Sequence, residues 1–163
     1  MLYDKATFSH IICTGIHNAM YHCQDKRTFL RNCYHWLIPN GYLILQLVDR
    51  ERFDPIPASG KSKVLVNPQK IATERITEAE INFNDFQYKS SYDFSKKEKV
   101  VLTETFTDSI SRKVRQNEHV LYMEDVDQIL YLARNCGFVV VGQTNLVEKG
   151  DEHQYIYLLE RPT

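Results

Sequence analysis

Residues 26–48, KRTFLRNCYHWLIPNGYLILQLV, contain the pattern that decides the fold of this chain. Asp25 stands before them as a good helix N-cap. The apolar residues that follow recur every three or four positions and share one helical stripe. They are Phe29, Leu30, Cys33, Trp36 and Leu37. Pro39 cannot continue the helix, and Gly41 permits a tight turn, so the apolar run 42–48 is expected to be a buried strand.

Another short apolar run precedes the helix and ends at a glycine. Residues 8–15, FSHIICTG, have the length and composition of a strand buried on both faces, as parallel sheets require. Together the two runs and the helix between them form a strand-helix-strand unit. Such a unit is expected to be parallel and right-handed.

The middle of the chain shows the alternating pattern of antiparallel strands. A loop over residues 50–60 and a brief strand at 61–66 come first, and a break is expected near residues 84–85. Two runs of apolar residues with shared parity then predict a hairpin with one apolar face. They are Phe86, Tyr88, Tyr92 and Phe94, followed by Val100, Leu102, Phe106 and Ile110. We expect the second arm to run on through Val114 towards Met123.

The last forty residues predict a helix and a strand pair. Glu124 and Asp125 place acidic side chains at a helix start, where the helix dipole favours them, and Gly137 ends the helix. Residues 138–141 and 154–159 are expected to be strands joined by a polar turn at 148–152, and this pair is expected to be antiparallel.

Composition narrows the classes of partner. The 163 residues carry a formal net charge of -1, so no basic field suited to a phosphate backbone is expected and nucleic acid is not an implied partner. The apolar runs are strand-sized, and residues 1–10 lack a signal-peptide core. We therefore expect no membrane partner and a cytoplasmic location.

The four cysteines form no C-x-x-C pair. Cys13, Cys23 and Cys33 are evenly spaced and His22 adjoins the second of them, so a metal site is one interpretation. Separations of ten residues do not match the short chelating loops that zinc prefers. Reduced thiols in the core are therefore expected, with no metal ligands.

The order of these elements resembles the C-terminal part of class I S-adenosylmethionine-dependent methyltransferases. Residues 29–45 resemble the family's helix, Leu-x-Pro-x-Gly turn and fifth strand. Residues 11–15 resemble the fourth strand and its cofactor-facing end, and residues 135–138 resemble a helix end and the Gly-Phe start of the sixth strand. The resemblance implies an α/β fold with a partial Rossmann-like sheet, made of the last four strands of seven.

It also implies a domain plan for residues 1–163. They would form one truncated methyltransferase-like domain, with residues 61–122 as an antiparallel β insertion that forms a lid. A complete family domain opens with a glycine-rich cofactor loop, whereas all six glycines here are isolated and no G-x-G occurs. Two interpretations remain open: a fragment that starts at an internal methionine, or a degenerate relative.

The same resemblance implies site residues at the ends of the first two strands. The expected cofactor-binding residues are Cys13, Thr14, Gly15 and Ile16, and the cofactor is S-adenosylmethionine. The expected substrate-binding residues are Asn18, Tyr21, His22, Asp49, Arg50 and Phe53. His17 is the candidate general base, because an imidazole titrates near neutral pH and open α/β sheets bind ligands at this edge. The structural alternative is a strand end, surface histidines and an ordinary charged loop.

Two functions are expected from this pattern. The first is an S-adenosylmethionine-dependent methyltransferase acting on a small molecule, weak or inactive as this chain alone. The alternative is a non-enzymatic module, derived from the same fold, that binds a partner or a ligand. In the family the strand at 8–14 lies between two others, so its exposed edge predicts a homo-oligomer or a second chain bound there.

Overall fold

The computed structural model describes residues 3–15, 18–56 and 68–163. The chain divides into two compact units, residues 1–53 with 122–163 and residues 54–121. The first unit holds β1 (Phe8–Cys13), α1 (Ala19–His22), α2 (Lys26–Trp36), β2 (Leu37–Val48), α4 (Val126–Asn135), β7 (Val139–Leu146), the 3-10 turn η1 (Val147–Lys149) and β8 (Asp151–Arg161). The second holds α3 (Pro68–Ile71), β3 (Glu78–Asn82), β4 (Phe86–Asp93), β5 (Lys99–Asp108) and most of β6 (Val114–Tyr122).

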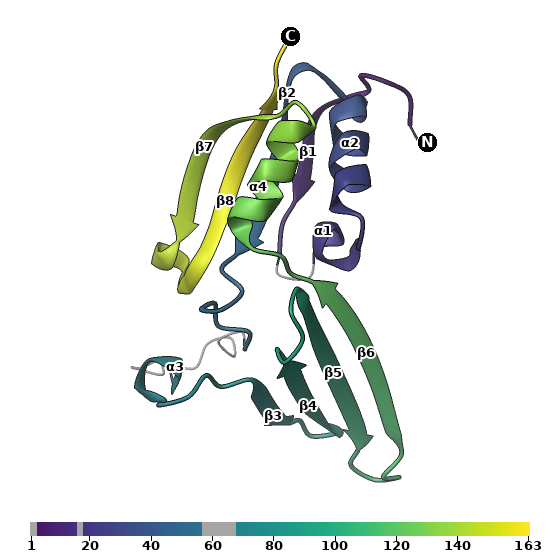
Figure 1. Cartoon of the computed structure of the whole chain (residues 1–163). Coiled ribbons are helices and arrows are strands. Elements are labelled where there is room, and N and C mark those ends of the chain that lie inside the picture. Colours follow the sequence, from purple (N-terminus) through teal and green to yellow (C-terminus); the bar gives the residue numbers. More distant parts are fainter. Residues whose placement is uncertain (1–2, 16–17, 57–67) are drawn as a thin grey trace. The chain divides into compact units, whose positions relative to one another are not determined.

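The sheet of the first unit has the strand order β1-β2-β8-β7 (Figure 1). β1 pairs with β2 in parallel, which confirms the predicted strand-helix-strand unit. β8 is antiparallel to both β2 and β7, which confirms the predicted antiparallel pair at the end of the chain. The sheet is therefore mixed, and its parallel part is the segment singled out by the sequence.

Helix α2 begins where the sequence predicted. The Asp25 carboxylate accepts hydrogen bonds from the backbone N–H of Thr28 at 2.9 Å and from its hydroxyl at 2.6 Å. Leu30 and Cys33 point into the core, and α2 packs against α4. The N-cap therefore forms as expected, and the stripe does so at Leu30 and Cys33. The expectation for Leu37 is wrong, because the helix ends at Trp36 and Leu37 begins β2.

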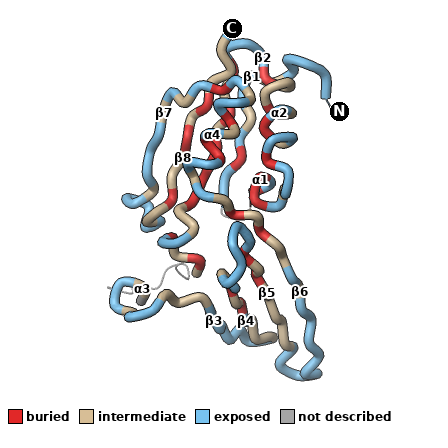
Figure 2. Tube along the Cα trace, viewed as in Figure 1, coloured by how far each residue is buried: buried red, intermediate tan, exposed pale blue. Residues whose placement is uncertain are grey.

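The two faces of this sheet are buried to different extents. Leu43, Leu45 and Leu47 alternate along β2 and are fully buried beneath the helices (Figure 2). On the opposite face Ile12, paired with Ile44, is 66% exposed. The expectation that the first strand is buried on both faces is therefore wrong for Ile12. Both α2 and α4 lie on one face of the sheet (Figure 1). The full burial of Leu43, Leu45 and Leu47 indicates that they point to this face, so Ile12 on the other face has no helix over it.

Helix α4 ends at the predicted glycine. The N–H of Gly137 donates to Arg134 O at 2.9 Å, and the N–H of Phe138 donates to Ala133 O at 3.1 Å. Gly137 has φ +104°, and a Cβ there would lie 2.9 Å from the Tyr34 ring. The position therefore needs glycine both for its backbone conformation and for its contact with α2.

The second unit is a four-stranded sheet with the order β3-β4-β5-β6. β4 and β5 form the predicted antiparallel hairpin, and the predicted break lies between the end of β3 and the start of β4. The expectation that the second arm runs on to Met123 is wrong, because a turn separates β5 from β6. There the Asp108 carboxylate accepts backbone N–H bonds from Ile110 and Ser111, which leaves Ile110 92% exposed. The strand expected at 61–66 lies outside the described residues.

Gly41, expected in a turn before the strand, lies inside β2, which begins at Leu37, and here β2 closely approaches Ser9 of β1. A Cβ at this position would be 2.8 Å from Ile38 O and 2.9 Å from Ser9 O, both backbone atoms that cannot move aside cheaply. We expect Gly41→Ala to lower the free energy of unfolding by about 1–3 kcal/mol. Gly142→Ala is the control, since its Cβ would meet the Leu158 side chain at ordinary contact distances, 3.5 Å from Cβ and 3.9 Å from Cδ2. Urea denaturation measures both, and equal effects would contradict the close approach.

Candidate functional site at the carboxyl edge of the first sheet

The carboxyl ends of β1 and β2 meet at one edge because the two strands are parallel. Thr14 and Gly15 follow β1 at this edge, and both are exposed. Asp49 and Arg50 follow β2 and are half-buried. Open α/β sheets bind ligands outside the carboxyl ends of their strands, so this edge is the candidate site.

Side-chain amides hold the chain after β1 against β2. The N–H of Gly15 donates to Gln46 Oε1 at 2.7 Å, and Asn18 Nδ2 donates to the backbone oxygen of Gln46 at 3.0 Å. Gln46 Nε2 in turn donates to Gln154 Oε1 on β8 at 2.8 Å. Asn18, Gln46 and Gln154 are all buried. This network fixes Gly15 and Asn18 relative to two strands, which preorganises the edge.

Several predicted site residues have a clear structural role. The Tyr21 hydroxyl accepts a hydrogen bond from the N–H of Val48 at 2.9 Å, and burial raises the pKa of this hydroxyl. Tyr21 and Phe53 are fully buried, and burial also raises the pKa of the Cys13 thiol. In this structure Tyr21, Phe53 and Cys13 are therefore packed in the interior beside the carboxyl edge. That they contact a bound ligand directly stays a prediction.

A buried lysine ties the two halves of the first unit together. Lys26 is 2% exposed, and its ammonium donates to Met20 O and to Cys23 O at 2.6 Å. It also forms an ion pair with Glu124 Oε2 at 3.4 Å, in the segment just before α4. Burial lowers the pKa of Lys26, and the carboxylate of Glu124 opposes that shift. The interaction closes α1 onto α2 and fastens both to the later part of the chain.

Small-molecule sites are cavities of about 300–1,000 Å³, and one of ≈ 640 Å³ opens beside the end of β2. Asp49 and Arg50 line it, together with Asp125, Val126, Asp127, Gln128, Gln143, Tyr155 and Tyr157. The Asp49 carboxylate is oriented by the N–H of Glu51 at 3.1 Å and by Arg52 Nε at 2.7 Å. The lining therefore offers carboxylates and phenol hydroxyls, which suit a ligand with hydroxyl or amino groups.

The structure thus brings some of the predicted residues to one edge. Thr14 and Gly15 are exposed at the end of β1, and Asp49 and Arg50 line the cavity after β2. His22 is exposed at the end of α1 and does not line this cavity. Buried beneath are Cys13, Asn18, Tyr21 and Phe53. Ile16 and His17 lie outside the described residues. Gln46 and Lys26 were missed, although a glutamine inside the apolar run 42–48 is a signal that could have been noticed.

Neither a metal centre nor a membrane helix is found in the described ranges. No group of three or more His, Cys, Asp or Glu side chains could hold a metal ion among residues 3–15, 18–56 and 68–163. Over the same residues, no helix combines the length and the apolar character needed to cross a membrane. All four cysteines are free thiols.

The burial and pairing of Lys26 predict that replacing it lowers the free energy of unfolding. Lys26→Met leaves the Glu124 carboxylate and two backbone carbonyls without their ammonium partner, so we expect a loss of about 3 kcal/mol in unfolding free energy. Lys149→Met, at an exposed position in η1, is the control and should change it by less than about 0.5 kcal/mol. Thermal and urea denaturation measure both. A loss at Lys26 no larger than that of the control would refute the role of the pair.

Comparisons with known proteins bear on the fold. No protein-family profile matches the chain, and no curated protein does. Among solved structures, an S-adenosylmethionine-dependent methyltransferase from Clostridium acetobutylicum has a TM-score of 0.69 at 14% identity over all of this chain and 62% of its own. The CcbJ methyltransferase from Streptomyces caelestis has a TM-score of 0.67 at 12% identity, over 100% of this chain and 61% of its own.

A third similar structure is CalS10, an amino pentose methyltransferase from Micromonospora echinaspora. It has a TM-score of 0.58 at 12% identity, over 96% of this chain and 59% of its own. The chain therefore spans about three fifths of the length of these structures. At such identities the likeness establishes the fold, a mixed α/β fold like that of methyltransferases.

Proposed function

We propose that this chain forms part of an S-adenosylmethionine-dependent methyltransferase that acts on a small polar molecule. The observation that carries the proposal is the superposition of the whole chain on methyltransferases at TM-scores of 0.69 and 0.67. The parallel pair β1–β2 supports it, because its carboxyl edge combines an exposed glycine with a cavity. Within the fold, the four strands of the first sheet are proposed to be the last four of a Rossmann-like seven.

The residues after β1 fit a cofactor at this edge. Gly15 has φ +89°, and nothing lies within 4 Å of the position that a Cβ would take. A ligand can therefore approach the backbone there, with Thr14 beside it. S-adenosylmethionine would supply an electrophilic methyl group on a sulfonium sulfur. The amide network through Gln46 would hold Gly15 in place for that contact.

The cavity after β2 is the proposed acceptor site. Methyl transfer needs an acceptor held in line and shielded from water, so positioning can supply much of the rate. Asp49, Asp127 and Tyr155 offer hydrogen-bond acceptors and hydroxyls for an acceptor with hydroxyl or amino groups. Two similar structures are described as an amino pentose methyltransferase and a sugar N-methyltransferase. His17 remains the proposed general base.

The antiparallel sheet of the second unit is proposed to serve as the lid. Tyr92, Val100 and Leu102 share one face of this sheet and are buried. Tyr88 donates its hydroxyl proton to Glu104 Oε1 at 2.8 Å, and His119 Nε2 lies 3.2 Å from Glu104 Oε2. Burial alone would raise the pKa of Glu104, but hydrogen bonds from Tyr88, Asn117 and His119 hold this pKa below its usual value.

Cofactor binding at the carboxyl edge can be tested with a matched pair of glycine substitutions. Gly15 and Gly150 both have positive φ and open space around a Cβ, so alanine should strain each by about 1 kcal/mol. We expect S-adenosylhomocysteine at millimolar concentration to shift the amide NMR signals of Thr14 and Gly15. Gly15→Ala should weaken that binding at least threefold, whereas Gly150→Ala should leave it unchanged. No shift at Thr14 and Gly15, or equal effects of the two variants, would contradict the cofactor site.

The edge of β1 is proposed to pair with a strand from a second copy of this chain. Within the described residues, β1 ends the sheet and pairs with β2 alone. An open strand edge that carries exposed apolar side chains promotes association, and Ile12 is such a side chain.

Sedimentation equilibrium should then show concentration-dependent self-association. Ile12→Lys should weaken it by adding charge beside the open edge. Val141→Lys, at a 45% exposed position on the other edge strand, should not. A monodisperse monomer at all concentrations would contradict this proposal.

A further inference from the structure

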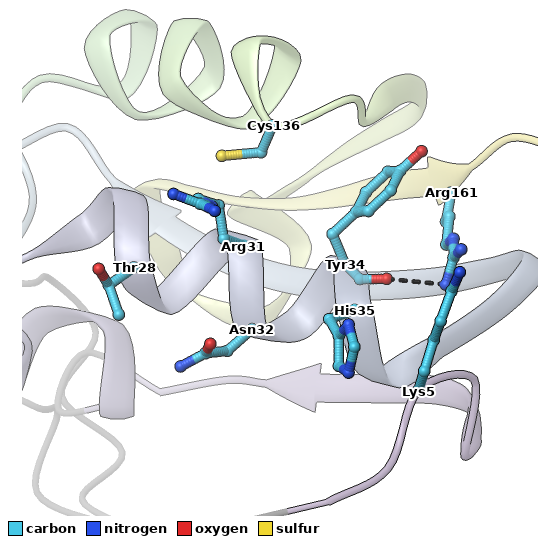
Figure 3. Close-up of a pocket in the computed structure, with 8 residues that line it drawn as sticks. All are labelled: Lys5, Thr28, Arg31, Asn32, Tyr34, His35, Cys136 and Arg161. Carbon is cyan, nitrogen blue, oxygen red and sulfur yellow. Dashed lines mark hydrogen bonds between the residues drawn. The ribbon is translucent and has the colours of Figure 1, made fainter. Parts of the chain in front are cut away.

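A second cavity lies at the opposite edge of the first sheet and differs in its charge. It has a volume of ≈ 400 Å³ (Figure 3). Its lining comes from the segment before β1, the outer side of α2, the end of α4 and the end of β8. The lining residues are Lys5, Thr28, Arg31, Asn32, Tyr34, His35, Cys136 and Arg161. Three of them are permanent cations and none is acidic.

Neutral groups hold the guanidinium of Arg161 in place. Its Nη1 donates to Tyr34 O at 3.0 Å and also to Leu37 O, and its guanidinium lies 4.9 Å from the centre of the Tyr34 ring. These partners are neutral groups at the end of α2. They fix the guanidinium at the cavity wall and supply only partial negative charge.

Lys5 is brought to the same cavity by backbone hydrogen bonds. The N–H of Ala6 donates to His35 O at 2.9 Å, and the N–H of Thr7 donates to Trp36 O at 2.7 Å. These bonds fasten the segment that carries Lys5 to the last turn of α2. Figure 3 shows Lys5 and Arg161 on the side of Tyr34 and His35, and Arg31 on the side of Cys136.

The cations have no acidic partner in the described part of the chain. None of the ion pairs found there includes Lys5, Arg31 or Arg161. Asp4 and Glu160 precede Lys5 and Arg161 in the chain but do not line the cavity, and Asp25 accepts two hydrogen bonds from the lining residue Thr28. Like charges gathered around one cavity repel each other, and an anion bound between them would remove that cost.

We propose that this cavity binds a small phosphate-bearing ligand with at least two anionic groups, such as a diphosphate. Arg31 and the pair of Lys5 and Arg161 would each hold one anionic group from opposite sides. The planar guanidinium suits two phosphate oxygens at once, and the ammonium acts as a point charge. Asn32 Nδ2 and the Tyr34 hydroxyl add neutral donors. The inference does not rest on the proposed function, because the two sites lie at opposite edges of the sheet.

The test uses all 163 residues of this chain, with inorganic pyrophosphate as the probe. Amide NMR signals of residues 31–35 and 161 should shift on titration, and orthophosphate should bind more weakly than pyrophosphate. Arg31→Gln should weaken pyrophosphate binding about tenfold, and Lys5→Gln combined with it should weaken it further. Raising the salt concentration should weaken binding in the parent chain more than in the double variant.

Lys149→Gln is the matched control, since it removes an exposed cation from η1 in the same unit and should change the affinity less than twofold. Amide spectra of each variant without ligand establish that it is folded. Arg161 is left unchanged because its guanidinium also supports the end of α2. The proposal is overturned if pyrophosphate shifts no residue of this cavity. It is equally overturned if Lys149→Gln weakens binding as much as Arg31→Gln, or if only an oligonucleotide binds.

Discussion

The close approach of β2 to β1 at Gly41 is the constraint on which the first unit depends. A parallel pair needs a connection that leaves the sheet at the carboxyl end of one strand and returns to the amino end of the next, and here α2 makes that connection. The return is tight enough that Gly41 lies against the backbone of Ser9. With the start of β2 placed in this way, its register sends Leu43, Leu45 and Leu47 to the helix side.

Buried polar groups select one arrangement of the helices and strands of the first unit, which apolar packing alone would not do. Apolar side chains of similar size can exchange places in a core at small cost, whereas a buried amide or ammonium must find its partner. Gln46 accepts from Gly15 and donates to Gln154, so it links the end of β1 with β8. Lys26 links α1, α2 and the segment before α4. Both interactions converge near the candidate site, which they make rigid.

The two edges of the first sheet carry opposite electrostatic character. At the carboxyl edge Asp49, Asp125 and Asp127 outnumber Arg50 around the cavity. At the other edge Lys5, Arg31 and Arg161 surround a cavity with no acidic lining residue. The formal net charge of -1 conceals this separation, because positive and negative side chains cancel in the sum. Local charge, and not the total, therefore indicates what each edge can bind.

Local pattern determined much of the fold. The N-cap at Asp25, the apolar stripe of α2, the glycine after α4 and the alternation of β4 and β5 each act over a few residues, so they could be predicted from the sequence. The predictions that were wrong depended on contacts or turns that the local apolar pattern does not show. Ile12 lies in an apolar run whose pattern does not say that both helices pack on the other face. The turn at Asp108 was hidden because apolar residues continue on both sides of it.

The residues of the candidate sites likewise fall into those that the sequence could indicate and those that only the tertiary structure shows. The sequence by itself placed Thr14, Gly15, Asp49 and Arg50 at strand ends, since a strand that ends in glycine or charge is a local feature. Only the tertiary structure decided that Gln46 supports that edge and that Lys26 meets Glu124. It also brought Lys5 and Arg161 to one cavity, although 155 residues lie between them in the chain. Such contacts join residues far apart in sequence, and strand pairing and helix packing determine them.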